Sequence, residues 1–436
     1  RVLQLVRDVG FEAFDFGKLE NARLLEPLAL VWIRLAYQHG LGRDFAFGIW
    51  DARTRSLFGA RDRLGLKPLY YTQQGSTLFI ASEAKALLSA LDRTPEPDDE
   101  LVLAMLLSEC REPDNTRSLF TGIHRLPPGH VLRMRDGRIE TSRYWQIDPA
   151  RQTLYRRPEE YVEHFGALFR EAVACRTRSA YPVGCTLSGG LDSSSITAMA
   201  AATAGSSVEA FTIFSDDPES DERRYARQVA ATAGIPLWEF HDRGHNPLEG
   251  LEELLWKVEC PLVSTMSDIP GFSRLVRSRH CRILLDGEGG DHLLDEEGYL
   301  SDLALKTPPA RFLRETRNFA DWYGAPARQF ASTAVNSVLP VSLKALGKHV
   351  LRRVPPDWIN RALAKRVGLA SRVRTPRSPL TFPSFAQAIT YENVCSPYFL
   401  LKLELIAREA AYAGREFWYP FLDSRLIEFI LSIPWD

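Results

Sequence analysis

The stretch at residues 183–205, V-G-C-T-L-S-G-G-L-D-S-S-S-I-T-A-M-A-A-A-T-A-G, constrains the fold of this chain most. Its first five residues form a short, mostly apolar run, which predicts a buried strand. Ser188-Gly189-Gly190 breaks the run, and from about Asp192 the composition favours a helix that Gly205 ends. Such a turn leaves unpaired backbone N–H groups at a helix N-terminus, so we predict an anion-binding site above the strand.

The side chains of this turn suit a phosphate that is bound together with a metal ion. Two glycines let the backbone approach a phosphate closely, and Ser188, Ser193 and Ser194 add hydroxyl donors. Asp192 would repel a phosphate unless a hard cation such as Mg²⁺ bridges the two. The string is not a Walker loop, because G-x-x-x-x-G-K-[ST] does not occur. S-G-G-L-D-S-S instead resembles the pyrophosphatase loop of the N-type ATP pyrophosphatases, which implies that ATP is cleaved between its α- and β-phosphates to adenylate a substrate.

Composition excludes several classes of protein. The chain has 436 residues, 45% of them hydrophobic, which is enough for two or three domains with sizeable cores. A formal charge of −1 gives no polycationic signature for nucleic acid, and no signal peptide or apolar run of transmembrane length is visible. The six cysteines show no C-x-x-C spacing, and Cys185 and Cys281 lie in apolar runs expected in the core. We therefore predict a cytoplasmic protein without structural zinc, a membrane anchor or a nucleic-acid partner.

Residues 1–147 are predicted to form a β-rich domain. Strand-like runs at 45–51, 57–62, 69–71 and 78–82 precede a hairpin whose turn is Asp136-Gly137. The strings F-A-F-G-I-W-D, A-R-D-R-L-G-L-K-P-L-Y-Y, I-A-S-E-A-K-A-L-L and L-P-P-G-H occur here in the same order as in the glutaminase-type domain of asparagine synthetases, which they resemble. That resemblance implies a sandwich fold of the N-terminal-nucleophile (Ntn) type.

The glutaminase chemistry of that domain is not expected. The family uses a cysteine at the mature N-terminus, whereas this sequence starts Arg1-Val2-Leu3 and its first cysteine is Cys110. Either the domain is a structural relic or the sequence lacks its natural start. The charged residues Arg61, Asp62, Glu83 and Lys85 are interpreted as structural ion pairs.

After a polar junction at 148–157, residues 158–436 are predicted to form an α/β domain. A helix from 158 to 179, strands at 208–214 and 236–240 and a helix at 220–233 alternate, which predicts a parallel sheet covered on both faces. Ligands of such sheets bind beyond the carboxyl ends of the strands, so Thr212, Ile213 and Phe214 are candidate nucleotide contacts. The fold class is α/β, with a glutaminase-like sandwich followed by a parallel-sheet ATP-pyrophosphatase domain of the adenine nucleotide alpha hydrolase type.

A second strand and glycine turn, R-I-L-L-D-G-E-G-G-D at 282–291, carries three acids that require a metal or a cationic partner. It resembles the family's G-E-G-x-D, and the resemblance implies that Asp192 and Asp291 hold Mg²⁺ and that the catalytic Glu288 sits beside the acyl-adenylate. His292 departs from the aspartate-glutamate that often follows in the family, and we interpret it as a surface residue. The implied nucleotide contacts, counting those of the first loop and the next strand, are Leu187, Ser188, Gly189, Gly190, Leu191, Asp192, Ser193, Ser194, Thr212, Ile213, Phe214, Asp286 and Gly287.

From residue 303 to the tail the sequence is predicted to be helical and rich in arginine, including a basic run at 346–374 that we interpret as a solvated face. The string P-F-L-D within W-Y-P-F-L-D-S-R-L-I-E-F matches a segment of the family. The resemblance also implies an essential lysine on a loop beyond it, but the sequence ends at Asp436 before that loop.

Together these strings resemble the asparagine synthetase superfamily, which implies a ligase that forms carbon–nitrogen bonds from ATP and a carboxylate, with release of AMP and pyrophosphate. The missing N-terminal cysteine and the variant lead-in to P-F-L-D favour a lasso peptide macrolactam synthetase, with a leader peptidase or leader-binding protein as a partner. A glutamine-hydrolysing asparagine synthetase and a β-lactam synthetase, whose family tends to have tyrosine at the position of Glu288, are alternatives. So is a catalytically silent relic that binds a nucleotide or a partner, although the intact Asp192, Glu288 and Asp291 argue against it. The substrate is either a peptide or a small-molecule carboxylate.

Overall fold

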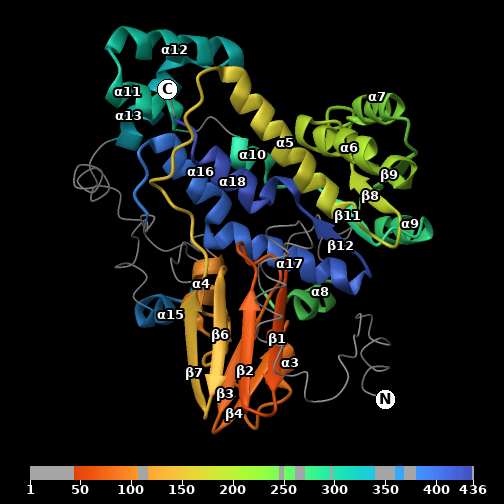
Figure 1. Ribbon diagram of the computed structural model, residues 1–436, viewed down its shortest axis with the longest axis vertical. Coiled ribbons are helices and arrows are strands. Elements are labelled where there is room, and N and C mark those ends of the chain that lie inside the picture. Colours follow the sequence, from red (N-terminus) through yellow and green to blue (C-terminus); the bar gives the residue numbers. More distant parts are fainter. Residues whose placement is uncertain are drawn as a thin grey trace.

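The computed structural model describes residues 44–106, 116–244, 250–260, 271–294, 298–338, 359–367 and 380–434. The expectations for the start of the chain, for Cys110 and for most of the basic run at 346–374 lie outside the described residues. Figure 1 shows two antiparallel sheets at one end of the molecule and a parallel sheet with its helices at the other.

The N-terminal domain is a sandwich of two small antiparallel sheets. Their orders are β1-β2-β6-β7 and β4-β3-β5. A shared core joins the two sheets. Leu69, just before β3, and Leu126, just after β5, pack against Leu132 of β6. Asp136 and Gly137 have φ values of 50° and 76°, as the predicted Asp-Gly hairpin turn requires. The elements are β1 (Ala46–Asp51), β2 (Ser56–Arg61), β3 (Tyr70–Gln74), β4 (Thr77–Ala81), α3 (Ala84–Leu88), α4 (Asp99–Leu106), β5 (His124–Arg125), β6 (His130–Arg135) and β7 (Arg138–Arg143).

The C-terminal domain is built on a five-stranded sheet of order β10-β9-β8-β11-β12. All four pairings are parallel, so the predicted parallel sheet is confirmed. One part of the prediction was wrong, because the tail is not helical throughout. Glu416–Trp418 forms β12, which is too short to show a period in the sequence and exists because it pairs with β11. The strands are β8 (Val183–Thr186), β9 (Val208–Phe214), β10 (Leu237–His241), β11 (Ile283–Leu285) and β12 (Glu416–Trp418).

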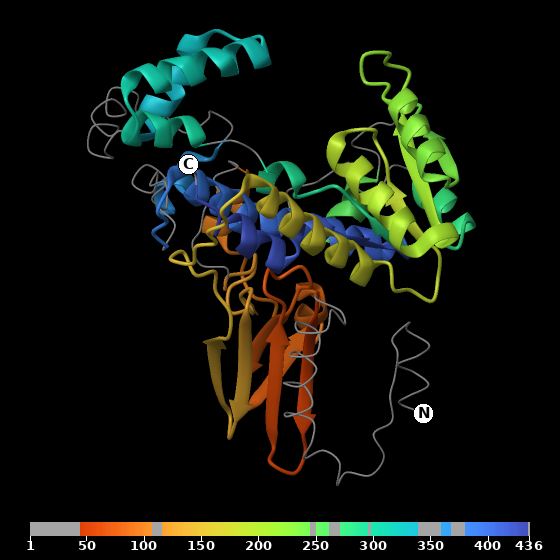
Figure 2. The same cartoon turned by 45° about the horizontal axis from the view of Figure 1, so that its top comes forward.

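Helices cover this sheet and extend away from it, as the two views in Figures 1 and 2 show. Within the described residues, no helix combines the length and the apolar character that crossing a bilayer requires. The helices are α5 (Pro158–Arg176), α6 (Leu191–Ala204), η2 (Gly205–Ser207), α7 (Arg223–Ala233), α8 (Leu251–Val258), α9 (Phe272–Ser278), α10 (Gly290–Leu294), α11 (Tyr299–Lys306), α12 (Pro309–Tyr323), α13 (Ala327–Val338), α15 (Arg361–Arg366), α16 (Phe385–Cys395), α17 (Pro397–Tyr412), η4 (Pro420–Leu422) and α18 (Ser424–Ile430).

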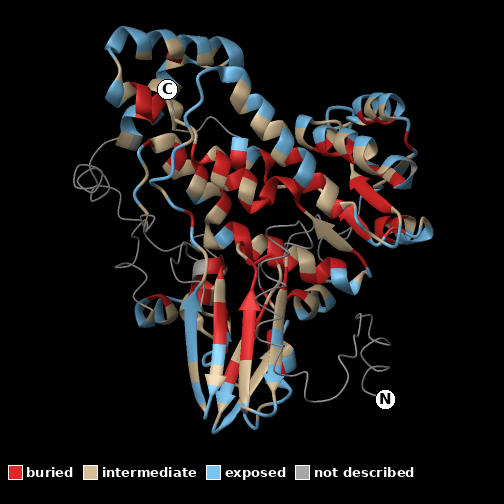
Figure 3. Ribbon diagram, viewed as in Figure 1, coloured by how far each residue is buried: buried red, intermediate tan, exposed pale blue. Residues whose placement is uncertain are grey.

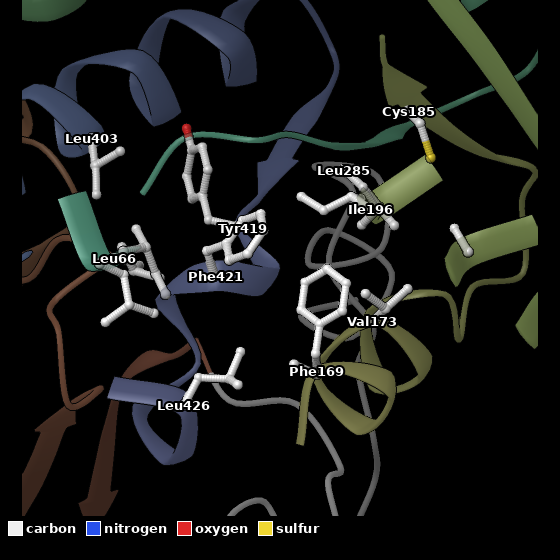
Figure 4. Packing of buried hydrophobic residues seen from close by; sticks show 14 of the residues in the cluster. Leu66, Phe169, Val173, Cys185, Ile196, Leu285, Leu403, Tyr419, Phe421 and Leu426 are labelled. Carbon is white, nitrogen blue, oxygen red and sulfur yellow. The ribbon is translucent and has the colours of Figure 1, made fainter. Parts of the chain in front are cut away.

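The largest core lies between the sheet, α5 and the C-terminal helices. Phe169 of α5 stacks on Phe421 of η4, with ring centroids 4.9 Å apart (Figure 4). Cys185 is fully buried there, and Cys281 is buried in the neighbouring cluster, as expected. Leu66 of the N-terminal domain belongs to the same core, so this core reaches across the domain junction, where Figure 3 shows a central band of buried residues.

A buried charge cluster joins the two domains beside this core. Glu404 of α17 is fully buried and accepts hydrogen bonds from Arg61 of β2 (2.9 Å), Arg125 of β5 (2.6 Å) and Arg408 of α17 (2.6 Å). Tyr70 of β3 also donates to it. Burial by itself would raise the pKa of Glu404, but the three arginines outweigh burial and hold that pKa well below its ordinary range. Arg61 is therefore a structural charge, as interpreted, although its carboxylate partner lies in the other domain.

Replacing Glu404 by Gln should destabilise the protein strongly. The change keeps the shape but removes the buried negative charge that three arginines share, which costs about 3–5 kcal/mol, although Arg408 keeps its ion pair with Glu259. Urea unfolding at pH 7 measures this loss. Glu253→Gln, at an ion pair on α8 whose carboxylate side chain is 71% exposed, is the control and should leave the unfolding midpoint nearly unchanged.

The same measurement has a defined pH dependence. Because folding lowers the pKa of Glu404, the stability it contributes is present at neutral pH and is lost as the pH falls below the unfolded value of about 4.3. The gap between wild type and Glu404→Gln should therefore narrow in acid. A gap that stays constant from pH 7 to pH 3 would contradict the role assigned to this carboxylate.

Candidate active site

Two glycine turns meet at the carboxyl edge of the parallel sheet because the strands that precede them are neighbours. β8 and β11 pair in register from Val183 opposite Ile283 to Cys185 opposite Leu285. A Cβ on Gly287 would lie 3.3 Å from the Cβ of Asp192, and a Cβ on Gly290 would overlap the Asp192 carboxylate. Glycine at these two positions lets the turns after β8 and β11 interlock.

The first turn presents an open helix N-terminus. Gly190 is the N-cap of α6, and no side chain caps the helix from that position. The Ser188 and Ser193 hydroxyl oxygens lie 3.0 Å apart, and Gly190 N–H donates weakly to Ser188 Oγ at 3.3 Å. Ser194 Oγ is buried and has no hydrogen-bond partner within the described residues. The hydroxyl of Ser194 thus lacks an acceptor, and those of Ser188 and Ser193 bond only within the turn, an arrangement at a helix N-terminus that suits an anion.

The other predicted nucleotide contacts of this turn differ in how far their side chains are buried. Leu187 is 1% exposed and donates its N–H to Phe211 O, so its side chain belongs to the core. Leu191, by contrast, is 88% exposed in the first turn of α6. Gly189 has a φ of 104°, and a Cβ there would lie 2.6 Å from Tyr225 Cβ of α7. The glycine therefore permits both the turn and its close packing on α7.

Asp192 and Asp291, the two predicted metal ligands, lie at neighbouring turns. The Asp192 carboxylate lies against the turn that carries Asp291, since a Cβ on the adjacent Gly290 would overlap it. Burial and the neighbouring Asp291 raise the pKa of Asp192 above its ordinary value. The described residues hold no group of three or more His, Cys, Asp or Glu side chains arranged around a metal. Two carboxylates together with phosphate oxygens are nevertheless the donor set that suits Mg²⁺.

Asp286 shapes the second turn. Its carboxylate accepts hydrogen bonds from Thr186 Oγ1 at 2.6 Å and from the backbone N–H of Glu288 at 2.8 Å. Burial raises its pKa. Both carboxylate oxygens are used within the protein, so this residue holds Glu288 where the turn presents it.

Glu288 has a partner that the sequence did not reveal. Lys402 of α17 donates from Nζ to both carboxylate oxygens of Glu288, at 2.9 and 3.0 Å. His292 Nδ1 lies 3.9 Å from Glu288 Oε1, and its ring stacks on Phe399 of α17 with centroids 4.1 Å apart. The one available sequence signal for Lys402 was a single lysine within the apolar run Y-F-L-L-K-L.

Tyr419 lies beside the same acids. It is 4% exposed, and its hydroxyl has no hydrogen-bond partner within the described part of the chain. Burial, together with the charges of Asp286 and Glu288, raises its pKa well above the ordinary value. Figure 4 shows the Tyr419 oxygen directed away from the rings of Phe169 and Phe421.

The end of β9 borders the first turn, because β9 pairs with β8. Thr212 is buried within the sheet, whereas Ile213 is exposed. The Phe214 ring stacks on His241 at 4.7 Å and carries the Arg223 guanidinium 3.7 Å from its centroid.

The P-F-L-D segment is a support behind the second turn. Its first three residues form η4 and are buried, and Asp423 accepts a hydrogen bond from Arg176 at 3.0 Å. A Cβ on Gly289 would lie 2.5 Å from Leu422 Cδ2, so the acidic turn is packed directly on this segment.

These features define a class of protein in which a glutaminase-like sandwich is joined to a parallel-sheet domain with a glycine-rich, acid-lined edge. Comparison with family models names it. The asparagine synthase family matches residues 164–436, and the glutamine amidotransferase domain matches residues 36–145. The chain belongs to the asparagine synthase family.

Several curated proteins are similar to this chain. Amidase chyE of Penicillium rubens is 31% identical over 65% of this chain and 44% of its own length. Amidase chry2 of Gibberella zeae is 26% identical over 92% of this chain and 64% of its own length. The glutamine-hydrolyzing asparagine synthetase 3 of Bacillus subtilis is 33% identical over 45% of this chain and 31% of its own length. The chain thus spans less than two thirds of each of these relatives.

The packing of the acidic turn predicts a large effect of Gly289→Ala. This glycine has a φ of 96°, and the added Cβ would meet Leu422. Strain and overpacking together should cost about 2–4 kcal/mol in urea unfolding. Gly75→Ala is the matched control, because Gly75 has a φ of 61° but no atom within 4 Å of its Cβ position. Equal losses from the two changes would show that Leu422 does not restrain the turn.

Proposed function

We propose that this chain is an ATP-dependent ligase that forms carbon–nitrogen bonds by adenylating a carboxylate and releasing pyrophosphate. The observation that carries the proposal is the placement of the Asp192 carboxylate against the turn that carries Asp291, beside the N-terminus of α6. Two adjacent carboxylates at an anion site fit a metal-bound polyphosphate, because the metal would compensate their mutual repulsion. Membership of the asparagine synthase family supports the same reaction class.

The residues of the site have distinct parts in this proposal. The phosphates of ATP would lie over the turn at 188–194, with serine hydroxyls and the α6 N-terminus as donors. Asp192 and Asp291 would hold Mg²⁺, which neutralises phosphate charge when bound. Ile213 and Phe214 would border the nucleotide on the neighbouring strand. Glu288 would orient the attacking nitrogen or take its proton, since it faces the same edge.

The specific substrate is the finer part of the proposal. We favour a macrolactam synthetase that joins an Asp or Glu side chain of a lasso-type peptide to the peptide's own N-terminus, served by a leader peptidase or leader-binding protein. Glutamine-dependent asparagine synthesis is the main alternative, and relatives of that name support it. β-Lactam ring closure is a further alternative. The domain boundaries at 147 and 158, and the lack of glutaminase activity, stay predictions.

Asp192→Ala and Asp291→Ala should each reduce ATP–pyrophosphate exchange on the order of 100-fold or more. The double variant should be little worse than either single variant, because the two carboxylates hold one ion as a unit. Asp321→Ala, an exposed carboxylate on α12, is the control and should leave the exchange unchanged. Full exchange by Asp291→Ala would refute the metal role.

Glu288→Gln should separate the two halves of the reaction. The change removes a charge but keeps the shape, so the exchange should persist while amide product falls by about 10²–10⁴-fold. Product mass spectrometry checks this with aspartate plus ammonium chloride, aspartate plus glutamine, and synthetic leader-bearing peptides. The acceptor that yields product distinguishes the alternatives. Normal product yield from Glu288→Gln would contradict its role, and no pyrophosphate release with any carboxylate would favour the silent relic.

A further inference from the structure

Four carboxylates gather at the carboxyl edge of the sheet, and one lysine faces them. Asp192, Asp286, Glu288 and Asp291 come from the turns after β8 and β11. Within the described ranges, Lys402 is the one lysine or arginine that forms an ion pair with any of these four. We propose that Lys402 is a positioning residue that holds the Glu288 carboxylate in place for the acyl-transfer step. The inference rests on the proposed function, which it deepens.

The geometry of the pair fixes the direction of the Glu288 side chain. Lys402 Nζ donates to Oε1 at 2.9 Å and to Oε2 at 3.0 Å, so neither oxygen can turn without losing a charge-assisted hydrogen bond. Behind it, Asp286 Oδ1 accepts the backbone N–H of Glu288 at 2.8 Å. The turn fixes the backbone, and the lysine fixes the carboxylate.

Lys402 is itself held by a firmly anchored helix. Ser396 caps α17 by accepting the Phe399 N–H at 3.1 Å. The Phe399 ring stacks on His292 of α10 at 4.1 Å, one turn before Lys402. Two residues after Lys402, Glu404 is fixed by the three arginines of the domain interface. A side chain held on a rigid element is what a preorganised site requires.

A role in folding alone would not explain the pair. The Lys402 side chain is 37% exposed and the Glu288 side chain 23% exposed, so solvent screens their attraction. Ion pairs of this kind contribute little to stability. Without Lys402, the Glu288 carboxylate would face Asp286 with no compensating cation and would move away from it. Replacing the lysine should therefore lower the rate of the reaction rather than the stability of the fold.

The first test detects the contact between Lys402 and Glu288 in the absence of substrate. Carbodiimide treatment of the wild-type protein should form a zero-length amide crosslink between Lys402 and Glu288, detected by peptide mass spectrometry. Glu288→Gln should abolish the crosslink. Lys257→Met, which removes the lysine of a surface pair with Glu253, should leave it unchanged. Absence of the crosslink in the wild type would overturn the proposal.

The second test measures positioning with Mg·ATP and hydroxylamine, using L-aspartate and a synthetic leader-bearing peptide as parallel carboxylate probes and the corresponding hydroxamate as the product. Lys402→Met should lower kcat by about 10–100-fold, because a displaced reacting group costs that much, while KM for ATP stays within about twofold. Lys402→Arg should restore most of kcat, since its guanidinium can still hold both oxygens. Tm should change by no more than about 3 °C in either variant.

The activity and Tm of the two Lys402 variants decide between positioning and folding. An unchanged kcat in Lys402→Met would overturn the proposal, as would a loss of activity that Lys402→Arg does not rescue. A large fall in Tm would assign the lysine to folding instead. An intact crosslink with no wild-type turnover of either carboxylate probe would count against the proposed function, and the role of Lys402 in the acyl step would fail with it.

Discussion

The buried carboxylate of Glu404 is the interaction on which the arrangement of this molecule depends. It binds arginines from β2, β5 and its own helix, so one charge ties both antiparallel sheets to α17. Leu401 and Leu405 of the same helix pack on Leu101 and Met105 of the N-terminal domain. The N-terminal domain is therefore part of the foundation that fixes α17, whatever chemistry it does or does not perform.

The candidate site also brings charges of the same sign close together, here the carboxylates at the edge of the parallel sheet. The parallel strands β8 and β11 bring Asp192 and Asp291 to one edge of the sheet, where burial and the neighbouring Asp291 raise the pKa of Asp192. Lys402 forms an ion pair with Glu288, whereas among the described residues no lysine or arginine pairs with Asp192 or Asp291, which suits the Mg²⁺ site proposed above. The same helix therefore supplies the buried charge that joins the domains and the lysine that faces the site, two residues apart in sequence.

Local patterns allowed much of this to be predicted, and long-range contacts limited the rest. The strand at 208–214, the Asp-Gly hairpin and the glycine turns follow from short-range periodicity and from backbone constraints, and they lie where expected. β12 has three residues and depends on pairing with β11, so no local signal marks it. Lys402 and Glu404 resemble ordinary helix charges, because Glu288, Arg61 and Arg125, their partners in other elements, are more than a hundred residues away in sequence. The P-F-L-D string indicated the family but not that η4 supports the acidic turn.

The central claim is that ATP is cleaved between its α- and β-phosphates by attack of a carboxylate. The most direct measurement uses a carboxylate substrate labelled with ¹⁸O in its carboxyl group, with ³¹P NMR and mass spectrometry of the nucleotide product. Adenylation followed by amide formation transfers one labelled oxygen to the phosphate, so AMP should carry one ¹⁸O and pyrophosphate none. Release of ADP and phosphate, or of unlabelled AMP, would contradict the account.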